Sequence, residues 1–199
     1  FAEAWVGALG YTLQLYFDFS GYSDMAIGAS YMFGIRLPLN FNSPYKAISI
    51  VDFWRRWHIT LSHFLRDYLY IPLGGSRKGK LRRHLNLLVT MLLGGLWHGA
   101  GWTFIFWGGL HGIYLIINHL YRSVRQSWGH NLKNDGWLLR GTGQITTFVA
   151  VVISWVFFKA SDFETATSML QSMFGFNGIN LPNFLEPYLG FLRNMSVDF

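Results

Sequence analysis

The 199-residue chain is 51% hydrophobic and 19% aromatic but only 13% charged, about half the charged fraction of an ordinary soluble domain. This balance excludes a disordered chain and predicts a membrane protein, because a water-soluble fold of this composition would expose large apolar patches. The chain contains no cysteine, which excludes disulfides, a thiolate nucleophile and a Cys-based zinc site. No signal peptide follows Phe1, and we interpret the chain as an internal part of a longer protein.

The net charge of +6 is concentrated in one segment. Residues 36–83 hold ten Lys and Arg against Asp52 and Asp67, so this segment carries +8 and the rest of the chain −2. A basic block between apolar segments is typical of a cytoplasmic loop that faces anionic lipid headgroups. Lys and Arg also contact the phosphates of nucleic acid. The apolar flanks favour the membrane interpretation, and we expect no nucleic-acid partner.

Four apolar stretches predict membrane helices. The interval between Arg83 and Arg122 has no formally charged residue and breaks at 99–101, which divides residues 85–121 into two helices. Glycines four residues apart within them fit close helix packing: Gly95 with Gly99, and Gly108 with Gly112. The predicted membrane helices are 1–35, 85–99, 102–121 and 143–158. The helix at 85–99 is short for a full span, so a re-entrant helix is the alternative there. The fold class is therefore all-α: a polytopic integral membrane helical bundle.

Asp18 and Asp24 interrupt the first apolar stretch. Their spacing of six residues places them about 240° apart around a helix, so they do not share a face. The segment 19–22 between them predicts a kink. At such a kink the two carboxylates would bond to free backbone groups or face a cavity, and both a structural and a catalytic role stay open.

Residues 50–71 predict an amphipathic helix that lies at the membrane interface. His58 falls on its apolar face, whereas His63 falls on the polar face with Arg and Asp residues. The apolar face consists of Trp54, Trp57, His58, Leu61, Phe64, Leu65 and Tyr68.

Loop charges orient the predicted bundle with the block 36–83 in the cytoplasm. After the span at 143–158, the acidic segment 162–199 lies outside. This segment predicts a short helix capped by Ser161, followed by a tail.

Histidines within the apolar runs are the main candidates for chemistry, because ionisable groups are costly in a membrane. His98 is surrounded by Gly and Ala, which leave room for a substrate beside its imidazole. Histidine suits general-base work because its ordinary pKa of about 6.5 is near ambient pH. For His111 we favour a hydrogen bond across the bundle. The spacing of the histidines requires no metal site.

Six ordered motifs run through the chain. They are YFDFSGYSDMAIG at 16–28, PLNFNSPY at 38–45, DFWRRWHITLS at 52–62, RDYLYIPLGG at 66–75, GLWHGA at 95–100 and WVFFKA at 155–160. Together they resemble the membrane-bound O-acyltransferase (MBOAT) family, in the bacterial branch of the alginate O-acetyltransferase membrane subunit.

The resemblance implies a polytopic enzyme of the bacterial inner membrane with a tunnel through the bilayer. It implies that His98 is the catalytic histidine and that His58 is the second active-site position. Family members are longer than this chain, so residues 1–199 are interpreted as the catalytic-core portion of one MBOAT domain. The family often has Arg in the last motif where this chain has Lys159.

The function we expect is transfer of an acyl group, acetyl foremost, from a cytoplasmic thioester to hydroxyls of an exported, alginate-like polysaccharide or to a relay partner. His98 would take the hydroxyl proton or assist the attack on the thioester, and His58 would position the acyl group or stabilise the oxyanion. The resemblance implies acetyl-CoA as donor, with no tightly bound cofactor. The other expected partners are membrane lipid, the polysaccharide and extracytoplasmic acetyltransferase proteins.

Three alternatives remain open from the residues. Within the family, the chain would transfer D-alanine towards teichoic acid. Outside it, the chain would be a fragment of a proton-coupled transporter whose buried His and Asp relay protons, or a structural assembly subunit that tolerates loss of both histidines.

Overall fold

The computed structural model describes residues 1–131 and 135–178, and every regular element in these residues is helical. The all-α prediction is confirmed. The elements are α1 (Ala2–Met32), the 3-10 helix η1 (Pro44–Lys46), α2 (Ile50–Trp54), α3 (Ile59–Leu65), the π-helix η2 (Arg66–Tyr70), α4 (Lys80–His98), α5 (Trp102–Ser127), α6 (Trp137–Lys159) and α7 (Phe163–Met173).

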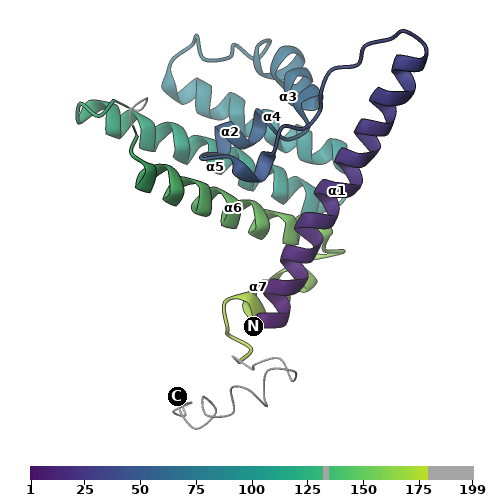
Figure 1. Cartoon of the computed structure of the whole chain (residues 1–199). Helices are drawn as coiled ribbons and strands as arrows, with labels where there is room; N and C mark the ends of the chain where they lie inside the picture. Colours follow the sequence, from purple (N-terminus) through teal and green to yellow (C-terminus); the bar gives the residue numbers. More distant parts are fainter. Residues whose placement is uncertain (132–134, 179–199) are drawn as a thin grey trace.

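Three long helices form the body of the molecule (Figure 1). α4 and α5 are an antiparallel hairpin, and α6 runs antiparallel to α5. The short helix α2 lies on α5, η2 contacts α4, and the first part of α1 packs on α6 and α7. The second part of α1 diverges from this body (Figure 1).

Glycines allow the backbones of α4 and α5 to approach each other closely. A Cβ atom at Gly95 would collide with the carbonyl oxygen of Phe104, and one at Gly108 would collide with the carbonyl oxygen of Met91. A Cβ atom at Gly112 would lie 2.9 Å from Cδ1 and 3.1 Å from Cα of Leu88. Gly99 follows the end of α4, and a Cβ atom there would lie 2.6 Å from the Phe104 ring. All four glycines of the predicted pairs therefore lie at close contacts between α4 and α5.

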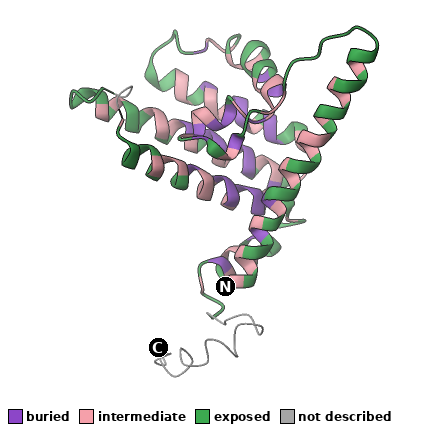
Figure 2. Cartoon of the chain, in the orientation of Figure 1, coloured by how far each residue is buried: buried purple, intermediate pink, exposed green. Residues whose placement is uncertain are grey.

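Buried side chains gather where α2, α5 and α6 meet (Figure 2). Aromatic rings are the bulkiest members of this core, beside smaller aliphatic side chains. Its largest fully buried side chains are Trp107, Trp155 and Phe53. The outer part of α1 is mostly exposed (Figure 2).

The prediction of one helix over residues 50–71 is wrong. α2 and α3 are separated by a turn in which His58 has left-handed backbone angles, φ 42° and ψ 57°, and the segment ends as the π-helix η2. Of the predicted apolar face, Trp54, Trp57, Leu61 and Leu65 are buried, but Phe64 and Tyr68 are exposed.

The loop before η1 explains this break. The Ile59 N–H donates to the carbonyl oxygen of Asn40 at 3.0 Å, and the Asn42 N–H donates to the carbonyl oxygen of Arg56 at 2.9 Å. These bonds satisfy backbone groups that a helix interrupted at the turn leaves free. A helical wheel of residues 50–71 cannot predict this break, because the loop with Asn40 and Asn42 lies outside that segment.

The predicted kink in α1 is also absent, because α1 is one helix from Ala2 to Met32. The Ser23 hydroxyl donates back to the Phe19 carbonyl oxygen at 2.8 Å. Apart from its chain neighbours and the adjacent helix backbone, no described atom lies within 4 Å of a Cβ placed on Gly21. No contact from another described element therefore bends α1 at Gly21. Asp18 and Asp24 are both exposed on it.

Several helices extend further than hydropathy predicted. α4 begins at Lys80, inside the basic block, and α6 begins at Trp137. Lys, Leu and Arg are good helix formers, so a helix continues past the apolar boundary. α7 is capped by Asp162 rather than Ser161, since the Asp162 carboxylate accepts the Thr165 N–H at 2.7 Å. The predicted tail at 179–199 lies outside the described residues.

Among the described helices, α6 is the one that meets the length and hydropathy expected of a membrane span. The multi-pass topology and the tunnel stay predictions.

Candidate functional site

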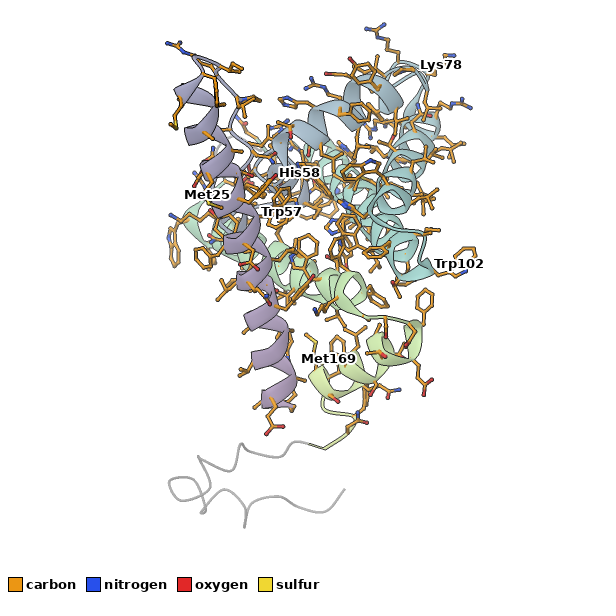
Figure 3. All side chains as sticks on the ribbon, turned by 90° about the vertical axis from the view of Figure 1, so that its right-hand side faces the viewer. Met25, Trp57, His58, Lys78, Trp102 and Met169 are labelled. Carbon is orange, nitrogen blue, oxygen red and sulfur yellow. The ribbon has the colours of Figure 1, made fainter. Side chains whose placement is uncertain are left out.

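His58 lies near the middle of the molecule, on the inner side of α1 (Figure 3). The turn between α2 and α3 places its half-buried imidazole with Nδ1 3.1 Å from Oδ1 of Asn40. The edge of the Phe19 ring packs against it, with the ring centroids 4.8 Å apart. His63 is exposed, so the predicted difference between the two histidines is confirmed.

The surroundings of His58 favour its neutral form. Burial foremost, and the neighbouring His98 in addition, together lower the pKa of the imidazole from 6.5 to about 4. Two cations in one poorly hydrated region repel each other, so the imidazoles are close enough to influence each other electrostatically. The structure thus brings together the two histidines that the sequence singled out.

His98 is the last residue of α4, and its ring is enclosed by aromatic edges. The ring centroid lies 5.2 Å from that of Trp107 and 5.4 Å from that of Phe158, both nearly perpendicular to it. No side chain in the described residues hydrogen-bonds to the imidazole of His98. Both ring nitrogens are therefore available to a substrate.

A wall of aromatic rings connects the two histidines. Trp57, next to His58, contacts Trp155 at 5.0 Å between ring centroids, and Trp155 stacks on Trp107 at 5.6 Å. The same Trp107 touches His98. The ring faces are apolar, although the indole N–H groups of Trp107 and Trp155 are buried without a described acceptor. Charge that develops near the histidines therefore interacts more strongly with them than it would in water.

His111 belongs to a separate, fully buried network. Its Nδ1 accepts the indole N–H of Trp54 at 3.2 Å, and its Nε2 lies 2.9 Å from the Ser154 hydroxyl. This is the hydrogen bond across the bundle that the sequence favoured, and it leaves neither nitrogen for a substrate.

Two site residues were missed from the sequence. Asn40 and Thr60 contact His58, and both lie inside motifs that the sequence analysis quoted without assigning them a role. The signal available was their polar character within otherwise aromatic motifs, which is too common to identify a residue.

A cavity of about 520 Å³ in the described residues does not include the two histidines in its lining. It lies between α5, α6 and the start of α2, where Arg122 and Arg140 line it together with Tyr114 and Ile117. Within residues 1–131 and 135–178, no three His, Asp or Glu side chains are grouped so that they could hold a metal ion.

The chain matches a known protein family over most of its length. The model of the membrane-bound O-acyltransferase family matches residues 1–163. This chain belongs to that family. The resemblance seen in the motifs is confirmed, and both histidines lie within the matched residues.

Curated relatives from the family are similar over most of this chain. It is 49% identical to a peptidoglycan O-acetyltransferase of Helicobacter pylori over 98% of this chain and 36% of the relative. It is 48% identical to a probable alginate O-acetylase of Azotobacter vinelandii, over 96% of this chain and 36% of the relative. It is 32% identical to a teichoic acid D-alanyltransferase of Bacillus subtilis, over 74% of this chain and 37% of the relative. The chain therefore spans little more than a third of the length of these relatives.

Proposed function

We propose that this chain provides the active-site histidines of a membrane O-acyltransferase that moves an acetyl group from a thioester to a hydroxyl. The observation that carries the proposal is the state of His98: its imidazole is unbonded within the described residues, enclosed by aromatic rings and within electrostatic reach of His58. Membership of the family supports acyl transfer as the chemistry.

His98 is the general base in this reaction. It takes the proton of the acceptor hydroxyl while the hydroxyl oxygen forms a bond to the thioester carbonyl carbon. The carbon–sulfur bond of the resulting tetrahedral adduct then breaks, and the imidazolium returns the proton to the leaving thiolate. The products are an ester and a free thiol, and His98 is neutral again. The half-buried His58 contacts the reacting groups and positions them.

The donor in this proposal is a cytoplasmic thioester, acetyl-CoA, which binds as a substrate and not as a resident cofactor. The acceptor is a hydroxyl of an exported, alginate-like polysaccharide, reached directly or through an extracytoplasmic acetyltransferase partner at the bacterial inner membrane. Acetyl is favoured over D-alanyl because the relatives named for O-acetylation are 48–49% identical, against 32% for the D-alanyltransferase.

The test uses the full-length protein in its own membrane, with polymer-bound acetyl ester as the readout. His98→Gln keeps a polar side chain of similar length but removes the base, and we expect transfer to fall by about 100-fold or more. The matched control is His63→Gln, because His63 is an exposed histidine on α3. Undiminished acetylation by His98→Gln at normal membrane abundance contradicts the assignment.

The two remaining functions give different products. D-alanyl transfer adds a primary amine to the polymer, which mass analysis distinguishes from an acetyl ester. A proton-coupled transporter moves its substrate in response to acid and leaves no covalent product. Neither is favoured by a specific contact in the described residues.

A further inference from the structure

Asn40 is the point at which three groups at the start of α3 meet. Its Oδ1 lies 3.0 Å from the Thr60 hydroxyl, 3.3 Å from the Thr60 backbone nitrogen and 3.1 Å from Nδ1 of His58. Its backbone carbonyl oxygen accepts the Ile59 N–H at 3.0 Å. Asn40 is distant in sequence from all of them, in the loop between α1 and η1.

The chemistry of these partners determines the proton positions. A backbone N–H only donates, so the Asn40 atom that faces Thr60 has to be the amide oxygen and not the amide nitrogen. An amide oxygen only accepts, so Nδ1 of His58 has to carry its proton. A neutral imidazole holds one ring proton. Nε2 of His58 is therefore bare and presents a lone pair.

Asn40 also fixes the ring's orientation. His58 does not cap α3 with its own side chain, and Asn40 takes this role by accepting the first two N–H groups of the helix. A rotation of the imidazole by 180° would exchange Nδ1 for a carbon and lose the bond to Asn40. Asn40 therefore stabilises the left-handed turn and also fixes the orientation of the His58 imidazole.

We propose that Asn40 is a positioning residue that keeps His58 in the Nδ1–H tautomer, so that Nε2 accepts a hydrogen bond from a hydroxyl of the acceptor. This inference rests on the proposed function, and it decides between the two roles that the sequence left open for His58. A neutral His58 held in this way has no proton to give to an oxyanion, so stabilising the oxyanion is not its role. The burial that disfavours the imidazolium acts in the same direction.

The proposal predicts different activities and pH profiles for two substitutions of Asn40, whereas a merely structural role would not distinguish them. Asn40→Ala removes the acceptor, frees the tautomer and is expected to lower kcat/KM by about 10- to 100-fold, as for other residues that orient a functional histidine. Asn40→Asp keeps the acceptor but adds a negative charge, which favours the imidazolium and raises the pKa of His58. Its activity is expected to approach that of the wild type above neutral pH and to fall at a higher pH than the wild type on acidification.

The matched control is Asn42→Ala. Asn42 is in the same loop and exposed, and its described hydrogen bonds come from its backbone. We expect its activity to stay within about twofold of the wild type and its pH profile to be unchanged, because loss of an exposed side chain away from a site has little effect.

The experiment measures acetyl transfer from acetyl-CoA to alginate oligosaccharides by membranes that contain the full-length protein, from pH 5 to pH 9. Absence of transfer by the wild type counts against the proposed function itself. If the wild type is active but Asn40→Asp has an unshifted acid limb, the positioning role is wrong. Should Asn40→Ala fail to accumulate in the membrane, Asn40→Asp decides the matter alone, because it keeps every bond to α3.

Discussion

The indole N–H of Trp54 donates to Nδ1 of His111 at 3.2 Å, and this bond determines the protonation of a buried chain of groups. Because an indole N–H only donates, Nδ1 is bare and Nε2 carries the proton. Nε2 donates to the Ser154 hydroxyl at 2.9 Å, which donates to the Val151 carbonyl oxygen at 2.7 Å. The chain joins α2, α5 and α6 and leaves no lone pair at His111 for catalysis.

His111→Ala is therefore expected to reduce stability more than catalysis. It leaves the buried indole N–H without its acceptor and the Ser154 hydroxyl without its donor, while Ser154 keeps its bond to Val151. We expect the free energy of unfolding to fall by about 2–4 kcal/mol. Denaturation by SDS in mixed micelles measures this loss. Ser154→Ala leaves the Nε2–H of His111 without its acceptor and should lower the free energy of unfolding by about 1–3 kcal/mol. A His111→Ala protein of normal stability that has lost acetyl transfer would place His111 in the active site instead.

The glycine contact between α4 and α5 predicts a difference between two adjacent positions. Gly108→Ala directs a methyl group at the Met91 carbonyl oxygen, so the helices have to separate, at a cost of about 1–3 kcal/mol. Gly109→Ala meets only the movable Leu92 side chain at 3.4 Å and should be nearly neutral. Melting temperatures in detergent compare the two variants. Equal destabilisation by both would mean that the close approach at Gly108 does not hold the hairpin.

The ion pair of Arg125 and Asp135 predicts a pH-dependent contribution to stability. The guanidinium donates to both carboxylate oxygens, at 2.9 and 2.7 Å, and this hydrogen bonding lowers the pKa of Asp135 below its usual 3.8. A depressed folded-state pKa stabilises the fold above the unfolded-state pKa, and the effect is lost as pH falls through the folded-state value.

Asp135→Asn tests this contribution. The melting temperatures of the wild type and the variant should differ at pH 6–7 and converge as the pH falls below about 4. The difference should also shrink in high salt, because the pair is near the surface. A difference that is constant with pH would assign the effect to packing instead of charge.

Tyr45 fastens the η1 segment to α1. Its hydroxyl donates to the carbonyl oxygen of the buried Thr12 at 2.7 Å, and its ring packs on Trp57 and Phe148. Tyr45→Phe keeps the ring and removes the donor, which should cost about 1 kcal/mol of unfolding free energy. Tyr31→Phe, at an exposed ring, is the control and should have no measurable effect. A loss equal in the two variants would show that the hydrogen bond contributes nothing.

The sequence predicts those parts of the fold that depend on local pattern. The Gly99–Gly101 break correctly separates α4 from α5, because glycine disfavours helix interiors. The turn at His58 could not be predicted, since Arg55, Arg56 and Trp57 are ordinary helix residues and the groups that stabilise the break lie in a distant loop. His58 still lies inward as predicted, because the Trp57 N–H continues the α2 pattern by donating to the Phe53 carbonyl oxygen at 2.8 Å.

Only part of the candidate site could be predicted from the sequence. His58 and His98 stand out because each is an ionisable residue within aromatic or apolar surroundings, and the structure places them near each other. Asn40 does not stand out, since its importance comes from a contact across 18 residues that no periodicity records. The tautomer of His58 follows from that contact together with the hydrogen bond from the Thr60 N–H to the same oxygen.

The left-handed backbone at His58 limits what natural variation can place there. Residues other than glycine pay about 1–2 kcal/mol for these angles, and Asn, Asp and His adopt them most readily. Family members that work without an imidazole at this position are therefore expected to carry Asn or Gly, and an isoleucine or valine there should be rare. An alignment of distant members can test this restriction without any experiment on the protein, since it concerns the shape of the chain and not the reaction.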